Sequence, residues 1–274
     1  MINLIVSQGR VADKTPRTII GAALTAQALE EHYGIKGKYI GKSALPAQDD
    51  WSVSLPQAKE TLLELGKAVE NSITRGGLTV IASNTCPASI ATLPVVARYY
   101  PDIVILWIDA HGDFNTPETT DTGYLGGMVL AATCGLWDSW HGGDVCSERV
   151  ILVGARDIDQ AENELIQKAG VRIISPLEAT PENILRTIKT SKIWIHVDWD
   201  SLEPGFVPAD YQVPNGIFPE QLRALFAAIP PEQILGIELA EFNAPINQDE
   251  QKKALSIILD IVSPILDPLK SLQF

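Results

Sequence analysis

Short apolar runs rich in β-branched residues alternate with longer segments of helical periodicity along this chain. Alternation of this kind is typical of βαβ units built around a mostly parallel sheet. The run at 103–108 is apolar at every position, so helices are expected to cover both faces of the sheet. About eight strands are expected, at residues 3–7, 38–41, 78–82, 103–108, 150–153, 171–174, 192–197 and 234–239. The intervening helices are expected at residues 19–32, 55–72, 88–97, 160–169, 181–190, 219–228 and 249–261.

The composition is that of an ordered globular protein, with 46% hydrophobic and 20% charged residues. A chain of 274 residues can bury a sizeable core, and α/β proteins of this length commonly form one domain. We therefore expect a single domain over residues 1–274. Acidic residues outnumber basic residues by 34 to 21, and the net charge of −13 argues against nucleic acid as a partner.

The sequence carries no signal for export or membrane insertion. Its first residues, Met-Ile-Asn-Leu-Ile-Val-Ser, lack the basic leader of a signal peptide. No segment approaches the roughly 20 consecutive apolar residues that a transmembrane helix needs. We expect a cytoplasmic protein without membrane contacts, and the sequence leaves its oligomeric state open.

Side chains that bind metals follow three of the expected strands. In open α/β sheets the ligand site lies beyond the carboxyl ends of the strands. The residues are Asp109, His111 and Asp113 after strand 103–108, Asp198 and Asp200 after strand 192–197, and Glu241 after strand 234–239. In the first two segments they recur at every second position, so an extended backbone would point them to one side.

Four aspartates and a histidine at adjacent strand ends would bury an excess of negative charge, which a protein interior tolerates only with cations. Oxygen-rich ligands with imidazole suit Mn²⁺, and bridging carboxylates can hold two ions about 3.5 Å apart. A lone Asp-x-His or Asp-x-Asp is usually a helix cap or a turn. Two such clusters together with a third acid favour a metal site instead, and we expect two Mn²⁺ ions.

Three segments resemble the arginase, or ureohydrolase, family. They run from Trp107 to Thr120 (Trp-Ile-Asp-Ala-His-Gly-Asp-Phe-Asn-Thr-Pro-Glu-Thr-Thr), from His196 to Pro204 and from Gly236 to Pro245. The resemblance implies a three-layer α/β/α sandwich with an eight-stranded, mostly parallel sheet. It also implies metal-dependent hydrolysis of the guanidino group of a small arginine-like substrate.

The same resemblance implies six metal ligands. One ion would be bound by Cys86, Asp109, Asp113 and Asp198, and the other by Asp109, His111, Asp198 and Asp200. Cys86 stands where the family has a histidine, and a soft sulfur ligand would favour Zn²⁺ or another divalent ion there. A free cysteine is otherwise commonly a small buried hydrophobe, so both interpretations of Cys86 stay open.

Two further positions depart from the arginase pattern. Gly126 stands where arginases have a proton-shuttling histidine, although a glycine there also suits a tight turn. Thr122-Gly123-Tyr124 replaces the Ser-Gly-Asn that holds the amino-acid end of the substrate, while Asn115 is retained. Together with the cysteine, these departures resemble a branch of the family that works in D-cycloserine biosynthesis and hydrolyses Nω-hydroxy-L-arginine to hydroxyurea and L-ornithine.

The resemblance implies that a water molecule bridging the two ions becomes the hydroxide that attacks the guanidinium carbon. Glu241 would bind the guanidinium, Asp113 would pass a proton to the departing amine, and Asn115 would contact the α-carboxylate end. His196 is expected to pack beside the site. Two alternatives remain open: an ordinary arginase or agmatinase acting on an unmodified guanidine, and a binding protein that kept the fold without the chemistry.

Overall fold

The computed structural model describes residues 1–270, so residues 271–274 of the expected domain lie outside the described part. The strands are β1 (Ile2–Ser7), β2 (Gly37–Ile40), β3 (Leu78–Ala82), β4 (Val104–Ile108), β5 (Val150–Val153), β6 (Arg172–Ile174), β7 (Ile193–Asp198) and β8 (Ile234–Ala240). The helices are α1 (Pro16–Tyr33), α2 (Trp51–Arg75), α3 (Ser89–Tyr99), α4 (Val129–Thr133), α5 (Gln160–Lys168), α6 (Pro181–Ile188), α7 (Pro219–Ala228) and α8 (Gln248–Lys270). None of these helices is long and apolar enough to cross a membrane.

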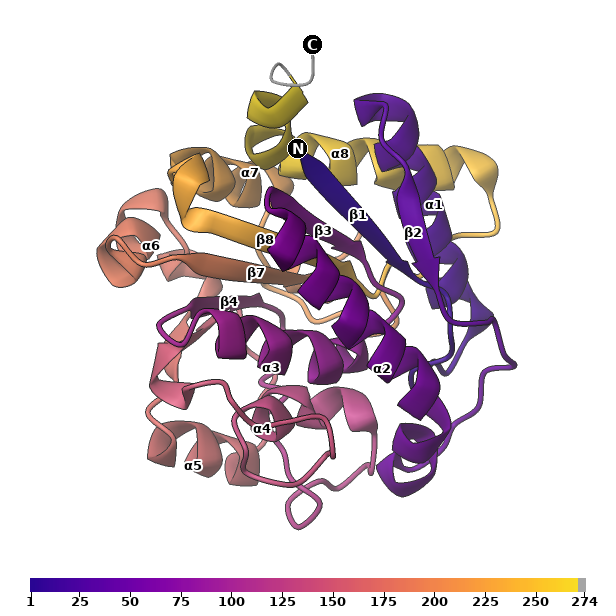
Figure 1. The fold of residues 1–274 in the computed structure, drawn as a ribbon. Coiled ribbons are helices and arrows are strands. Elements are labelled where there is room, and N and C mark those ends of the chain that lie inside the picture. The colour runs from indigo at the N-terminus through magenta and orange to yellow at the C-terminus, as the bar shows by residue number, and fades with distance from the viewer. Residues whose placement is uncertain (271–274) are drawn as a thin grey trace.

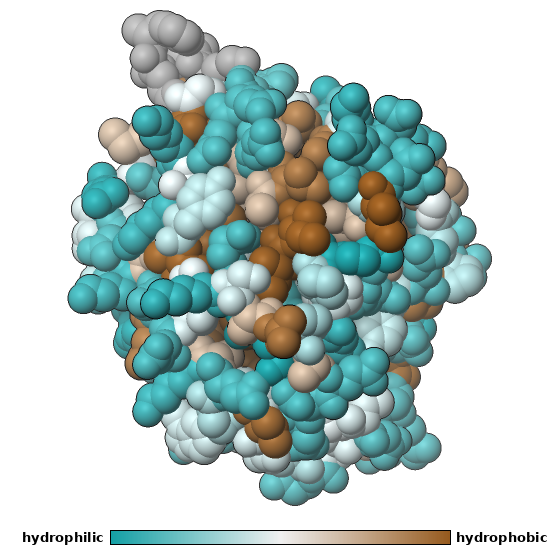
Figure 2. All heavy atoms as spheres, turned by 90° about the vertical axis from the view of Figure 1, so that its right-hand side faces the viewer, coloured by the Kyte–Doolittle hydropathy of each residue, from teal (hydrophilic) through white to brown (hydrophobic). Residues whose placement is uncertain are grey.

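The strands form one sheet in the order β2-β1-β3-β8-β7-β4-β5-β6, and every pairing among the described strands is parallel. The two edge strands are among the shortest, with four residues in β2 and three in β6, which limits the backbone available for pairing with another chain. On the β2 side of the molecule the surface is mostly hydrophilic, with hydrophobic side chains in a central band and in smaller patches around it (Figure 2).

Two helix layers cover the sheet, as expected (Figure 1). Leu106 and Ile108 of β4 belong to a core shared with α1, α6, α7 and α8. Ile105 and Trp107 of the same strand belong to a second core shared with α2, α3, α4 and α5. Because alternate residues of a strand face opposite sides, an all-apolar strand supplies both cores at once. The α/β/α sandwich follows from this pattern.

The three longest helices, α1, α2 and α8, begin and end further out than their apolar periodicity indicates, whereas α7 has the expected bounds and α5 and α6 end one and two residues earlier. α1 begins at Pro16, where the Thr15 side chain accepts a hydrogen bond from the backbone of Arg17, and Gly34 ends it in the left-handed conformation (φ 64°). The expected end of the last helix at residue 261 is wrong, because α8 continues to Lys270 through two prolines. Apolar residues beyond that point, such as Ile265, pack into the core and compensate for the lost backbone hydrogen bonds.

Candidate active site

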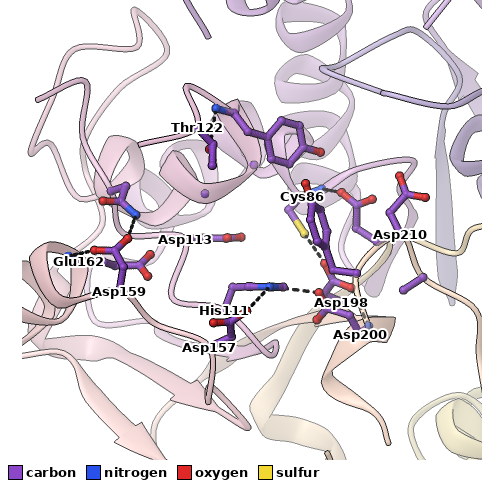
Figure 3. Close-up of a pocket in the computed structure, with 17 residues that line it drawn as sticks. Cys86, His111, Asp113, Thr122, Asp157, Asp159, Glu162, Asp198, Asp200 and Asp210 are labelled. Carbon is purple, nitrogen blue, oxygen red and sulfur yellow. Dashed lines mark hydrogen bonds and ion pairs between the residues drawn. The ribbon is translucent and has the colours of Figure 1, made fainter. Parts of the chain in front are cut away.

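A cavity of about 300 Å³ opens beyond the carboxyl ends of the central strands β3, β8, β7 and β4 (Figure 3). This volume suits a small-molecule ligand. Seven of the eight residues predicted for the site line it: Cys86, His111, Asp113, Asn115, Asp198, Asp200 and Glu241. The eighth, Asp109, is 1% exposed and hydrogen-bonded to the backbone of His111. Parallel strands thus bring residues far apart in sequence to one edge of the sheet.

The segment after β4 forms the first group of possible ligands. Asp109 accepts hydrogen bonds from the His111 backbone (2.7 Å) and from Nε1 of Trp107 (3.0 Å). Nδ1 of His111 lies 3.0 Å from Oδ2 of Asp200 and 3.3 Å from Oδ1 of Asp109. Burial lowers the pKa of His111, but the hydrogen bonds to these two carboxylates outweigh it and raise the pKa. One imidazole nitrogen and two carboxylate oxygens therefore lie within 4.8 Å of one another.

Cys86 belongs to a second group, with Asp198 and Glu241. Its thiol lies 3.1 Å from Oδ2 of Asp198, and its backbone N–H donates to Oε1 of Glu241 at 3.0 Å. Cys86 is only 3% exposed, yet it lines the cavity. Its sulfur therefore shares the cavity with the acids, which a purely packing role would not require.

The loop that carries Cys86 is fixed by the segment that precedes α1. Nδ2 of Asn84 donates to Oδ2 of the buried Asp13 at 2.5 Å, and Oγ1 of Thr85 donates to the carbonyl oxygen of Val11 at 2.5 Å. Both contacts join residues more than 70 positions apart in the chain. The position of the sulfur is thus set by tertiary contacts as well as by the end of β3.

The backbone that follows β4, β7 and β8 is not extended, although the spacing of the acids was interpreted for an extended backbone. Asp113 (φ 50°) and Glu241 (φ 64°) adopt the left-handed conformation, and Asp200 lies in a short 3-10 turn at Trp199–Ser201. Left-handed non-glycine residues are uncommon and often lie at functional sites. The condition of an extended backbone is therefore not met, and turns after the strands bring these acids to the cavity instead.

His196 lies behind Cys86 and is fully buried. Its Nε2 is 3.2 Å from the sulfur, its Nδ1 is 3.0 Å from Oε2 of Glu238, and its ring stacks on Trp107 with centroids 3.6 Å apart. A third group of possible ligand atoms comprises Cys86, Asp109 and His196. Glu238 was not predicted from the sequence, although this acid stands inside an otherwise uncharged strand, which was the available signal.

The rim of the cavity contains further acids that were not predicted from the sequence. Asp157 and Asp159 follow β5, Glu162 lies in the first turn of α5, and Asp210 lies in the loop after β7. Asp157 and Asp159 repeat the spacing of two residues after a strand, so the signal was present. Nδ2 of Asn115 donates to Oδ2 of Asp159 at 2.9 Å, which links the predicted substrate-binding residue to this rim.

The electrostatics of the cavity fit divalent cations. Burial, followed by repulsion between neighbouring acids, raises the pKa values of Asp113 and Asp198 well above the usual range and that of Asp200 to about 6. Burial also raises the pKa of Glu241. The imidazole of His111 balances only part of the charge of these carboxylates. Their oxygens, with one imidazole and one thiol, form a donor set suited to divalent metal ions.

The all-parallel sheet and the acid-lined cavity at its carboxyl edge define an α/β protein with a candidate metal centre. The chain belongs to the arginase family, whose model matches residues 4–263. It is 60% identical over 267 residues to the N(omega)-hydroxy-L-arginine amidinohydrolase of Streptomyces lavendulae, covering 97% of this chain and 98% of that protein. The native structure of the arginase from Bacillus caldovelox has a TM-score of 0.83 at 26% identity, covering 96% of this chain and 97% of the other. The expected family and fold are confirmed, and membership of this family implies divalent metal ions.

Proposed function

We propose that this chain is an amidinohydrolase that hydrolyses Nω-hydroxy-L-arginine to hydroxyurea and L-ornithine. The observation that carries the proposal is the 60% identity, over 97% of the chain, to a protein named for action on that compound. The geometry supports it, because the cavity joins groups of possible metal ligands to a buried acid suited to a guanidino group. A small-molecule substrate fits a cavity of this size.

Six residues are proposed to hold two divalent ions, with Mn²⁺ as the expected metal. They are Cys86, Asp109, His111, Asp113, Asp198 and Asp200, of which Asp109 and Asp198 are proposed to bind both ions. When bound, the ions supply the activated water that attacks the guanidino carbon. The sulfur of Cys86 makes Zn²⁺ or another divalent ion suitable at its position.

Glu241 is proposed to orient the guanidino group. One of its oxygens accepts the hydrogen bond from the backbone of Cys86, and none of the hydrogen bonds among residues 1–270 engages the other, which is proposed to accept N–H groups of the substrate. The left-handed backbone at Glu241 sets the direction of its side chain. Charge-assisted hydrogen bonds to a buried carboxylate would hold the carbon in one place and exclude other orientations.

Asp113 and Asn115 complete the proposed reaction site. A carboxylate oxygen of Asp113 is proposed to receive a proton and deliver it to the departing amine, as a general acid does. Asn115 lies toward the rim, bonded to Asp159, and is proposed to contact the amino-acid end of the substrate. The rim acids Asp157 and Asp159 give that end a negative field that suits an α-ammonium group.

Ornithine release by the Mn²⁺-loaded protein, measured with Nω-hydroxy-L-arginine and with L-arginine, tests this proposal. We expect a strong preference for the hydroxylated substrate. A preference for L-arginine would indicate an ordinary arginase instead. Release from neither, combined with a failure to bind two metal ions per chain, would support a binding protein that lost the chemistry.

Replacing Glu241 with glutamine is expected to lower kcat/KM for Nω-hydroxy-L-arginine by about 10- to 100-fold. The amide can still accept from the Cys86 backbone, but a hydrogen bond to a charged partner is worth about 1.5–3 kcal/mol, and that contribution is lost. Initial rates over a range of substrate concentrations measure the effect. The exposed Glu220→Gln on α7 is the control, and equal kinetics for the two variants would exclude the proposed role.

A further inference from the structure

The ring of Tyr124 occupies the space above Gly126. A Cβ atom built on Gly126 would lie 2.3 Å from Cε1 and 2.9 Å from Cζ of Tyr124, well inside van der Waals contact. Gly126 is not among the glycines with positive φ, so its backbone conformation does not require glycine. The glycine is explained by the tyrosine ring, and the alternative of a tight turn is not needed.

Tyr124 lines the same cavity as Cys86 and Glu241, near the proposed position of the guanidino group. Burial, followed by the negative charge of Glu241, raises the pKa of Tyr124 well above its usual value, so the phenol keeps its proton. Among residues 1–270, none hydrogen-bonds to the Tyr124 hydroxyl. The cavity therefore contains a neutral hydroxyl that is free to bind a ligand.

The orientation of this ring is fixed by further contacts. Nζ of Lys14 lies 3.5 Å from the centroid of the Tyr124 ring and donates to the hydroxyl of Tyr211 at 2.5 Å. The Tyr211 ring packs edge-on against His111, with centroids 5.5 Å apart. A cation over an aromatic face is attracted to it, so Lys14 stabilises the ring where it stands.

We propose that Tyr124 is the residue that selects a hydroxylated guanidine, by donating a hydrogen bond from its phenol to the N-hydroxyl oxygen of the substrate. Most ionisable side chains of this cavity are carboxylates, which accept hydrogen bonds when ionised and cannot donate one to an added oxygen. A neutral O–H donor beside them offers that oxygen a favourable partner. An unmodified guanidino group lacks the oxygen and gains nothing from this contact. The inference rests on the proposed function and names its specificity determinant.

Tyr124→Phe keeps the ring above Gly126 and removes the hydroxyl alone. We expect kcat/KM for Nω-hydroxy-L-arginine to fall about tenfold, while the inhibition constant of L-arginine in the same assay stays within about twofold. Unchanged kinetics, or an equal loss of affinity for both compounds, would overturn the role of Tyr124. If the wild-type protein releases no ornithine from the hydroxylated substrate, both the proposed function and this inference fail.

Tyr99→Phe is the matched control, because it removes a tyrosine hydroxyl at the surface, outside the cavity. That hydroxyl donates to Glu70 at 3.2 Å, and we expect the preference for the hydroxylated substrate to stay within about twofold. A loss of preference in Tyr99→Phe as large as that in Tyr124→Phe would show that the effect does not come from the cavity and would overturn the inference.

Gly126→Ala tests the steric part of the inference. The added methyl group must displace the Tyr124 ring, so this variant is expected to lose the preference as Tyr124→Phe does. In a Tyr124→Ala background the same substitution meets no ring and should change kinetics and melting temperature little. Equal effects of Gly126→Ala in both backgrounds would show that the ring is not what residue 126 accommodates. Melting curves of the metal-loaded variants establish that each one is folded.

Discussion

Asp109→Ala is expected to slow ornithine release from Nω-hydroxy-L-arginine by about a thousandfold or more. Asp109 is proposed to bind both metal ions, and metal ions contribute several kcal/mol to catalysis, with each 1.36 kcal/mol worth a factor of ten in rate. The carboxylate is also held in place by hydrogen bonds from Trp107 and from the backbone of His111.

Metal content shows whether Asp109→Ala loses activity because it has lost a metal ion. We expect elemental analysis to find fewer than two ions per chain in Asp109→Ala and two in the wild-type protein. Asp102→Ala is the control, because Asp102 lies just before the same strand, is 92% exposed and is paired with Arg149 at the surface. A variant that keeps two ions and loses less than tenfold in rate would exclude Asp109 as a shared ligand.

The sequence predicts the edge of the sheet at which the site lies, because that edge depends only on strand direction. Once β4, β7 and β8 are recognised as parallel strands, the acids that follow them must meet. Seven of the eight predicted site residues line one cavity for this reason. The short helix α4 was not predicted, since five residues after a glycine pair carry too little periodicity to distinguish a helix from a loop.

Contacts across the sheet could not be predicted in the same way. His196 and Glu238 are register partners on β7 and β8, but they are 42 residues apart in the chain. Their pairing depends on the strand order, which an alternating pattern does not specify. The turns that place Asp113 and Glu241 in the left-handed conformation are likewise set by tertiary contacts, since neither residue is a glycine. The sequence therefore indicated the ligands better than the residues that hold them.

Glu238→Ala is expected to lower the free energy of unfolding by about 3–5 kcal/mol, the usual cost of removing one partner from a buried ion pair. Glu238 is 1% exposed and accepts hydrogen bonds from Ser89, Thr92 and His196, so its removal takes a buried acceptor from all three, although Ser89 and His196 remain 3.2 Å apart. Burial raises the pKa of Glu238, but the interactions with His196 and the hydrogen bonds from Ser89 and Thr92 together outweigh it and lower the pKa. The carboxylate therefore stabilises the fold above the pKa of about 4.3 of an unfolded glutamate, and this contribution is lost as the pH falls through the lower folded value.

Urea unfolding of the metal-loaded protein at neutral pH measures this loss, with the exposed Glu232→Ala just before β8 as the control. Glu238→Gln should lose less than Glu238→Ala, because the amide keeps the volume and still accepts from Ser89 or Thr92. The greater stability of the wild type over both variants should shrink toward acid pH, since protonation removes the charge that the variants lack.

Loss of the Glu238 carboxylate should also disturb the active site, because the His196 ring contacts the sulfur of Cys86 and stacks on Trp107, the donor to Asp109. Stability equal to that of Glu232→Ala would show that this buried acid does not support the site.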